Sequence, residues 1–357
     1  MTALRTSSDV APPRRRTSTG VVMTDVAAVA GVSQKTVSRV VNGSSQVRPE
    51  VRLRVQQAID QLGYRPNGAA RALVTSRTHV IGVVGLGSAL YGVAQHVMGI
   101  ERAARAAGYG VVVVSTEEGD GDEVTEGVER VLALGAEGVV LVEPLFDASR
   151  HLARYAGTPL VTATQAVGEE QRVATVDVDQ EQGVDLAVDH LVALGHRRIG
   201  HLAGPSTWRS GLVREQAWRR ALERHGLPVP APVRGDWSPR SGYHGMRELL
   251  AGERPTAVLA GNDHMAVGAM RALAEAGLRV PQDVSLVGFD DVPEAEYLPV
   301  PLTTVRQDFA LVAERSVASV VELVERGGDG SRRVSVPVTF HPRASTGPAP
   351  VGGGRSA

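Results

Sequence analysis

The sequence predicts a small all-α domain near the N-terminus, followed by an α/β body with two doubly wound parallel-sheet lobes. Apolar residues keep a helical spacing from Thr24 to Leu62, whereas short apolar runs alternate with longer helical patterns from Val80 onward. The charge divides near the same place: residues 1–77 hold 12 basic and 4 acidic residues, and the remainder holds 26 and 35. A basic module attached to an acidic body suggests that the smaller domain binds a polyanion.

The N-terminal region divides into an arm and three short helices. Residues 1–22 are expected to form a disordered basic arm, because the three arginines at 14–16 stand among Ser, Thr and Pro with no apolar run behind them. Residues 23–66 predict three helices that are separated at residues 31–33 and 42–49. Thr24 and Ser33 are suitable N-caps for the first two helices, and Pro49 fits the first turn of the third.

The body is predicted to contain many short parallel strands, with helical patterns between most of them. So many strands exceed one open sheet of normal width, so residues 79–343 are expected to form two similar halves. The cleft between them, at the carboxyl ends of the strands, is the natural ligand site. Residues 331–340 look like a closing strand, and residues 344–357 look like a flexible tail. The other predicted strands are Val80–Val84, Gly110–Val114, Gly138–Val142, Pro159–Ala163, Ala174–Val178, Ile199–Ala203, Val233–Trp237, Ala257–Ala260 and Val284–Gly288.

Composition and motifs exclude several classes of function. The chain has no Cys, which removes disulfide frameworks, Cys-ligated metal sites and a cysteine nucleophile. No apolar stretch approaches the roughly 18 residues that span a bilayer, so we expect no membrane partner and a cytoplasmic protein. The common catalytic motifs are missing, and the His residues stand singly without metal-ligand spacing. We therefore expect no enzyme activity, no metal and no cofactor.

One pair of carboxylates leaves an enzymatic alternative. Asp177 and Asp179 are two residues apart on a predicted strand, so they share a face and could act as paired acid and base. The favoured interpretation is that they mark a strand end or a crossover between the lobes. A glycoside hydrolase therefore ranks as the third hypothesis for the whole chain.

The stretch TDVAAVAGVSQKTVSRVVN, from Thr24 to Asn42, shows two short helices joined by a Gly-containing turn in a basic segment. This is the pattern of a helix-turn-helix, whose second helix lies in the major groove of DNA. Gln34, Lys35 and Arg39 are the expected base readers, whereas Ser33 and Thr36 suit phosphates. An ordinary helical hairpin with a solvated basic face is the alternative. The polar side chains of the second helix that remain outside are Gln34, Lys35, Thr36, Ser38 and Arg39.

These residues resemble the lactose repressor (LacI) family, and the similarity runs from about Met23 to Phe340. It implies a DNA-binding transcriptional repressor whose two lobes have the fold of the type I periplasmic binding proteins. GDWS at Gly235–Ser238 and LTTVRQDF at Leu302–Phe309 resemble the member that gives the family its name, which implies a β-galactoside or related sugar as effector. The other matching motifs are TDVAAVAGVSQKTVSRVVNG, LGYRPNGAARAL, GVDLAVDHLVALGHRRIGHLAGP and GNDHMAVGAMRALAEAGLRVPQDVSLVGFDD.

The resemblance implies that residues 67–78 hold a hinge helix and linker, and that the helix from Asn67 to Leu73 is ordered only on operator DNA. Leu73 would insert into the minor groove as an apolar wedge that bends the duplex, with Ala70 and Arg71 beside it. A packed linker residue is the alternative for Leu73. Together with the helix-turn-helix, the expected DNA contacts are Thr24, Ser33, Gln34, Lys35, Thr36, Ser38, Arg39, Asn42, Asn67, Ala70 and Leu73.

The resemblance assigns the sugar cleft to Arg214, Trp237, Asn262, Asp290 and Phe309. Carboxylate, amide and guanidinium groups suit the hydroxyl pairs of sugars, and aromatic rings suit their C–H faces. Asn262 and Asp290 each follow a predicted strand, at the edge where doubly wound folds bind ligands. The alternatives are a core position for Trp237, a turn cap for Asp290 and an exposed helix charge for Arg214.

Two departures from the family pattern concern the ligand and the assembly. Thr164, also placed in the cleft, stands where the galactoside-binding member has an aspartate, so a galactosyl preference does not follow from the resemblance. Residues 344–357 contain no leucine heptads, and Pro348 and Pro350 break helices, so a tetramer is not expected. We expect a homodimer on a pseudo-palindromic operator.

The main alternative for the function of the whole chain is a freestanding sugar receptor of the periplasmic type without DNA function.

Overall fold

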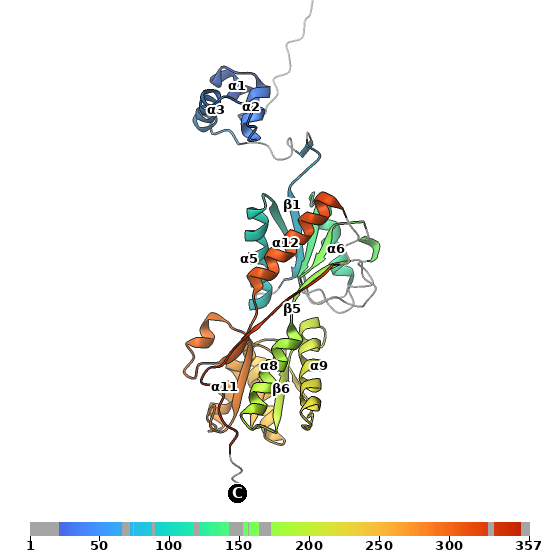
Figure 1. Cartoon of the computed structure of the whole chain (residues 1–357), viewed down its shortest axis with the longest axis vertical. Coiled ribbons are helices and arrows are strands. Elements are labelled where there is room, and N and C mark those ends of the chain that lie inside the picture. The colour runs from blue at the N-terminus through green and yellow to red at the C-terminus, as the bar shows by residue number, and fades with distance from the viewer. Residues whose placement is uncertain are drawn as a thin grey trace, which may run out of the picture. The chain divides into compact units, whose positions relative to one another are not determined.

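The computed structural model describes residues 21–65, 72–73, 75–87, 90–117, 121–142, 153–155, 157–163, 173–327 and 332–350. The chain divides into two compact units, Met1–Thr78 and His79–Ala357 (Figure 1). The predictions for the arm up to residue 20, for Asn67 and Ala70, for Thr164 and for the tail after residue 350 lie outside the described residues. No described helix has both the length and the apolar character that a membrane crossing requires.

The N-terminal unit contains three helices: α1 (Met23–Ala30), α2 (Gln34–Val41) and α3 (Pro49–Leu62). One fully buried valine from each helix, Val26, Val37 and Val55, belongs to their common core. This arrangement confirms the three helices that the apolar spacing predicts.

The caps of these helices agree with the predictions at two of three positions. Ser33 is the N-cap of α2, and its Oγ accepts a hydrogen bond from the Thr36 amide at 3.2 Å. Pro49 is the first residue of α3. The N-cap prediction for Thr24 is wrong, because α1 begins one residue before it and Val22 is the N-cap. The Asp25 carboxylate accepts the Val22 amide at 2.9 Å and so takes over the capping role.

The first lobe of the body is built on a parallel sheet in the order β11-β5-β4-β3-β1-β2. Such a sheet is buried on both faces, which explains why β3, β4 and β5 read as nearly continuous apolar runs. Its elements are β1 (Val80–Leu86), α5 (Tyr91–Ala106), β2 (Gly110–Thr116), α6 (Gly121–Ala133), β3 (Gly138–Val142), a 3-10 turn (Ala153–Tyr155), β4 (Leu160–Thr162), β5 (Ala174–Val178), α12 (Phe309–Arg326) and β11 (Arg333–Val336).

The second lobe repeats the plan in the order β12-β10-β9-β8-β6-β7, where only the β10–β12 pair is antiparallel. Every predicted strand of this lobe is present, although β7 ends before Trp237. The elements are α8 (Gln180–Ala193), β6 (Ile199–Ala203), α9 (Arg209–Arg224), β7 (Val233–Arg234), α10 (Pro239–Ala251), β8 (Ala257–Ala260), α11 (Asp263–Glu275), β9 (Ser285–Asp290), a 3-10 turn (Pro293–Glu296), β10 (Thr303–Arg306) and β12 (Thr339–His341). The two similar α/β lobes confirm the predicted fold class.

The chain passes between the lobes three times: from β5 to α8, from β10 to α12 and from β11 to β12 (Figure 1). The first passage explains the carboxylate pair of the sequence. Asp177 lies near the end of β5, and the Asp179 side chain caps α8 by accepting the Gln182 amide at 2.9 Å. The crossover interpretation of the pair is therefore confirmed. The single closing strand predicted for residues 331–340 is wrong, because it splits into two strands that belong to different sheets.

The flexible-tail prediction is wrong for residues 344–350, which pack along the second lobe. The Thr303 amide donates to Ser345 Oγ at 2.7 Å, and that hydroxyl donates to the Leu286 carbonyl at 2.6 Å. The Ala349 amide donates to the Leu194 carbonyl at 2.8 Å. Glycine and proline content identified a segment that is not helical, but such a segment can still be fixed by hydrogen bonds to a neighbouring lobe.

Candidate functional site

The second helix of the N-terminal unit carries an exposed polar face. Gln34, Lys35 and Arg39 are exposed, whereas Val37 and Val40 are buried against the other two helices. An isolated helix surface of this kind has the width and the donors needed to read base edges in a major groove. The structure therefore places the three predicted base readers on one accessible element.

The other predicted DNA contacts of this unit surround that face. Thr36 and Ser38 are half-buried, and Ser33 and Thr36 join their hydroxyls at 2.9 Å. The side-chain Nδ2 of Asn42 donates to Ser38 Oγ at 3.4 Å, at the C-terminal end of α2. Thr24 is exposed on α1. The serine and threonine side chains among them suit phosphate contacts because they hold their hydroxyls close to the backbone.

Leu73 is 86% exposed. A single exposed leucine is common on protein surfaces, but this value disagrees with the alternative in which Leu73 is packed within the linker. The predicted neighbours Asn67 and Ala70 lie outside the described residues.

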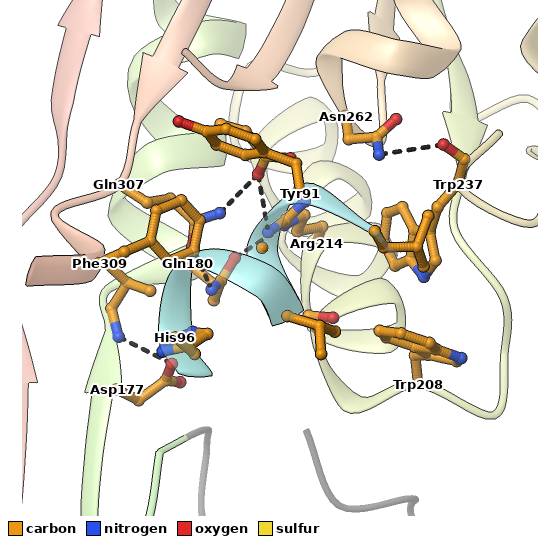
Figure 2. A pocket seen from close by; sticks show the side chains of 16 residues that line it. Tyr91, His96, Asp177, Gln180, Trp208, Arg214, Trp237, Asn262, Gln307 and Phe309 are labelled. Carbon is orange, nitrogen blue, oxygen red and sulfur yellow. Dashed lines mark hydrogen bonds and ion pairs between the residues drawn. The ribbon is translucent and has the colours of Figure 1, made fainter. Parts of the chain in front are cut away.

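The body has a pocket at the carboxyl ends of strands from both lobes, where the fold class predicts a ligand (Figure 2). It includes all five of the described residues that the sequence assigned to the cleft. It also contains residues that the sequence analysis did not select. The lining residues are Leu90, Tyr91, Gly92, Val93, His96, Asp177, Val178, Gln180, Trp208, Ser210, Arg214, Trp237, Asn262, Asp290, Gln307 and Phe309.

Arg214 projects from α9 into the middle of this pocket and is buried (Figure 2). Its Nε donates to Gln180 Oε1 at 2.7 Å and its Nη1 donates to the Gly261 carbonyl at 2.6 Å. Its Cζ lies 3.8 Å from the centroid of the Phe289 ring, so the guanidinium stacks on an aromatic face. The surface-charge interpretation of Arg214 is therefore wrong.

Two glutamines connect Arg214 to Asp290. Gln180 Nε2 donates to Gln307 Oε1 at 3.1 Å, and Gln307 Nε2 donates to Asp290 Oδ1 at 2.6 Å. Arg214 Nη2 lies 3.9 Å from the same carboxylate oxygen, which completes a closed polar network. Sequence reasoning missed both glutamines, although Gln180 is the second residue after β5, and Gln307 directly follows β10 and stands within the LTTVRQDF block.

The environment of the Asp290 carboxylate is unfavourable for its charged form. Burial raises its pKa above the usual value, while the charge of Arg214 and the hydrogen bond from Gln307 act in the opposite direction. Its backbone φ is 117°, in a region that residues other than glycine rarely adopt. Strain and burial together at one carboxylate are typical of ligand sites.

Asn262 and Trp237 form one wall of the pocket. Asn262 caps α11, since its Oδ1 accepts the Met265 amide at 2.8 Å, and its Nδ2 donates to the Trp237 carbonyl at 3.2 Å. The Trp237 ring lies so close to Gly204 that a Cβ at that position would come within 2.1 Å of ring atoms. The glycine is therefore required to let the ring lie against the backbone.

Phe309 enters the pocket from the first residue of α12. Its ring meets Tyr91 edge-on with centroids 5.8 Å apart and meets His96 edge-on at 5.1 Å. Burial lowers the pKa of His96 to about 4, so its imidazole is neutral at physiological pH. Within the described ranges, no cluster of three or more His, Asp or Glu residues could hold a metal ion.

Comparisons with known proteins cover both units of the chain. Residues 22–67 match the family model "Bacterial regulatory proteins, lacI family", and residues 188–346 match that of a periplasmic binding protein-like domain. The chain is 38% identical over 305 residues to the lactose operon repressor of Escherichia coli (strain K12), covering 85% of this chain and 84% of that protein. It is 36% identical over 290 residues to the ribose operon repressor of the same strain, covering 80% and 87%.

Solved structures show the same relationship at the level of the fold. The chain superposes with a TM-score of 0.84 and 36% identity on a lac repressor dimer bound to operator and the anti-inducer ONPF, covering 92% of this chain and 99% of that one. Identity and coverage of this extent, together with the helix-turn-helix and the two-lobed body, establish the relationship. The chain belongs to the LacI family of bacterial regulatory proteins.

Proposed function

We propose that this protein is a DNA-binding transcriptional repressor that leaves its operator when a sugar binds between the lobes of its body. The observation that carries the DNA-binding part is the exposed face of α2, where Gln34, Lys35 and Arg39 stand free of the helical core. Gln can pair with adenine and Lys or Arg with guanine, so this face can read sequence. Such a repressor acts in the cytoplasm, where the DNA is.

The proposed assembly is a homodimer on a pseudo-palindromic operator. The solved lac repressor structure, at 36% identity, is a dimer bound to operator. A two-fold symmetric dimer presents two equivalent α2 helices, which requires two half-sites of related sequence. Leu73, exposed in the linker, is the proposed wedge between the half-sites.

The proposed effector is a neutral sugar. The pocket combines a guanidinium, carboxylates and amides with aromatic rings, which are the groups that bind sugar hydroxyls and sugar C–H faces. The two relatives are repressors of a lactose operon and of a ribose operon. A β-galactoside is the first sugar to test, since GDWS and LTTVRQDF supply Trp237, Gln307 and Phe309 to the pocket.

The pocket network also suggests how a sugar could change DNA binding. Gln180 lies at the β5-to-α8 passage and Gln307 at the β10-to-α12 passage, so their hydrogen bond joins two of the three connections between the lobes. A sugar that competes for Arg214 and Asp290 would alter this bond and thereby favour another arrangement of the lobes. The effect is allosteric only to the extent that the sugar binds the two arrangements with different affinity.

Fluorescence anisotropy of the full-length protein on duplex DNA from upstream of its own gene tests this proposal. We expect tight binding that a monosaccharide or disaccharide reverses, and no binding to a shuffled duplex of equal length. Sugar binding without any DNA binding would instead support a freestanding receptor. Conversion of the sugar by purified protein would instead support a hydrolase.

A further inference from the structure

The strand end that carries Asp290 has an unusual backbone. Asp290 closes β9 with a φ of 117°, and Asp291 follows it with a φ of 56°. Residues other than glycine rarely adopt positive φ, so two in succession need contacts that hold them there. The backbone sets where a short side chain points, so the direction of the Asp290 carboxylate depends on this bend. The contacts that fix the bend therefore bear on ligand binding.

One side of the bend is held by Asp263, the first residue of α11. Its Oδ2 accepts the Val292 amide at 2.8 Å, and its Oδ1 accepts the Thr304 hydroxyl of β10 at 2.6 Å. The carboxylate reaches these partners across Gly288, where a Cβ would lie 2.1 Å from Asp263 Oδ1. Asp263 is fully buried and does not line the pocket, so it supports the bend from inside the lobe.

The other side of the bend is held by Arg343, which follows β12. Its Nη2 donates to Asp291 Oδ1 at 2.7 Å, and the two side chains are only 17% and 11% exposed. A charge-assisted hydrogen bond that is shielded from water in this way is stronger than an exposed ion pair. In the described part of the chain, Asp290 lines the pocket, whereas Asp291 and Arg343 do not.

Arg343 is itself fixed to the chain around β10. Its Nη1 donates to the Leu302 carbonyl at 2.8 Å, and its amide donates to Thr303 Oγ1 at 2.9 Å. A guanidinium with both terminal nitrogens engaged has little freedom left, so it can act as a fixed support for Asp291. Because Arg343 follows β12, this support connects the third passage between the lobes to the edge of the ligand pocket.

We propose that Arg343 is a positioning residue for the effector site and that it acts through Asp291. Together with Asp263, it holds the bend that directs the Asp290 carboxylate at the ligand. Without this support the bend would have to be ordered when the sugar binds, which lowers affinity. The inference rests on the proposed sugar-sensing function and adds that residues after β12, outside the pocket, set the affinity for the effector.

A double-mutant cycle, measured by isothermal titration of the full-length protein, tests the inference. The probes are lactose, cellobiose and ribose, and the sugar that binds the wild-type protein most tightly is used for the variants. Arg343→Met removes the guanidinium, whereas Asp291→Asn removes only the carboxylate charge and tolerates the positive φ. We expect sugar affinity to fall about tenfold in the first and about threefold in the second. The double variant should lose no more than Arg343→Met alone, because both changes act through one ion pair.

Two further sets of variants separate positioning from a general loss of stability. Arg343→Lys keeps the positive charge and should restore part of the affinity that Arg343→Met loses. Arg279→Met and Asp283→Asn are the matched controls, because they remove an exposed Arg–Asp pair of the same lobe, with atoms 3.0 Å apart, and should leave sugar affinity unchanged. Operator affinity should stay within about twofold in every variant, since α2 belongs to the other unit.

Hydrogen exchange measured by mass spectrometry reports on the bend without any ligand. Peptides that contain Val292 should exchange faster in Arg343→Met than in the wild-type protein, whereas peptides from α9 should keep their rate. If circular dichroism shows that Arg343→Met does not fold, Asp291→Asn makes the same predictions.

The outcomes separate this inference from the function on which it rests. Folded variants that bind the sugar as tightly as the wild-type protein, or losses that simply add in the double variant, would overturn the positioning role and leave sugar sensing in place. Binding of no probe by the wild-type protein would overturn both.

Discussion

At the scale of single residues, the pocket gathers groups that are unfavourable without a ligand. Asp290 is buried with a raised pKa and a backbone φ of 117°, while its neighbour Asp263 is buried and has a pKa raised well above the usual value by burial and by the charge of Asp290. Two acids so close together tolerate burial only because Thr304, Gln307 and Arg214 are directed at them. We therefore expect substitutions here to affect ligand binding more than DNA binding.

Asp290→Asn tests this expectation. The side chain keeps its shape, and Asn tolerates positive φ, but the charged acceptor for sugar hydroxyls is lost. We expect sugar affinity to fall by about 10- to 100-fold, which corresponds to one charge-assisted hydrogen bond. Operator affinity should stay within about twofold, so the variant stays on DNA at sugar concentrations that release the wild-type protein. Anisotropy titrations measure both quantities, and normal release would remove Asp290 from the sugar site.

Buried histidines predict how stability depends on pH. Burial lowers the pKa of His96 and of His201 to about 4, and His201 stacks on Trp218 with centroids 5.2 Å apart. The unfolded chain, where the histidine pKa is near 6.5, binds more protons than the folded chain between pH 6.5 and 4. The contribution of these two histidines to stability is therefore complete above about pH 6.5 and falls as the pH drops toward 4, by about 3 kcal/mol for each of them.

Urea unfolding at several pH values between 7.5 and 5 measures this loss. His201→Gln should reduce the slope of stability against pH, because one buried titrating group is gone. His244→Gln, at an exposed position, should keep the wild-type slope. Identical slopes for His201→Gln and the wild-type protein would show that the His201 imidazole is not buried in the neutral form.

At the scale of elements, α2 depends on a few short-range contacts. Ser33 caps it, Val37 and Val40 anchor it, and Arg39 projects from its outer face. Because the apolar anchor and the polar face are on opposite sides of one short helix, a change on the outer face should alter DNA binding without unfolding the unit.

Arg39→Ala should therefore lower specific operator affinity by about 30-fold or more, the effect of losing one base contact of about 1–3 kcal/mol in each of the two half-sites. Sugar affinity should stay unchanged, since the pocket belongs to the other unit. Arg105→Ala, on the surface of α5, is the matched control for loss of one positive charge. Loss of sugar binding in Arg39→Ala would show that the reading helix has been misidentified.

Local signals predicted the elements better than the contacts between them. The apolar periodicity located α1, α2 and α3 and every strand named beforehand except the closing strand at residues 331–340, because these elements depend on neighbours within a few residues. Thr24 was misassigned as a cap because α1 already begins at Met23, where the Asp25 carboxylate accepts the Val22 amide. Gln180 and Gln307 were missed because they are 127 residues apart and meet only once the fold is complete. The packing of Ser345 against Leu286 is likewise a long-range contact that composition cannot reveal.

At the scale of the whole molecule, charge is separated between the two units. The first 77 residues carry an excess of basic residues and the rest an excess of acidic ones. Contacts between DNA and the protein are therefore expected to involve the N-terminal unit and to release counterions from phosphates.

Operator affinity should accordingly fall about 1,000-fold or more between about 50 and 200 mM salt, if the dimer contacts six or more phosphates. Sugar affinity should change little over the same range, because the proposed effector is uncharged. Anisotropy and calorimetry in parallel salt series measure the two dependences. A flat salt dependence of DNA binding would contradict a basic unit that contacts the phosphate backbone.

The three passages between the lobes have a consequence for how the chain is made. The first sheet needs β11, and its covering helix α12 packs against α5 and β3, yet both segments follow nearly all of the second lobe in the sequence. A ribosome that has synthesised everything up to residue 308 has therefore produced a first lobe that lacks an edge strand and exposes the apolar surface under α12. The nascent chain would therefore need a chaperone while the first lobe is unfinished, even though this lobe begins to leave the ribosome before the second lobe does.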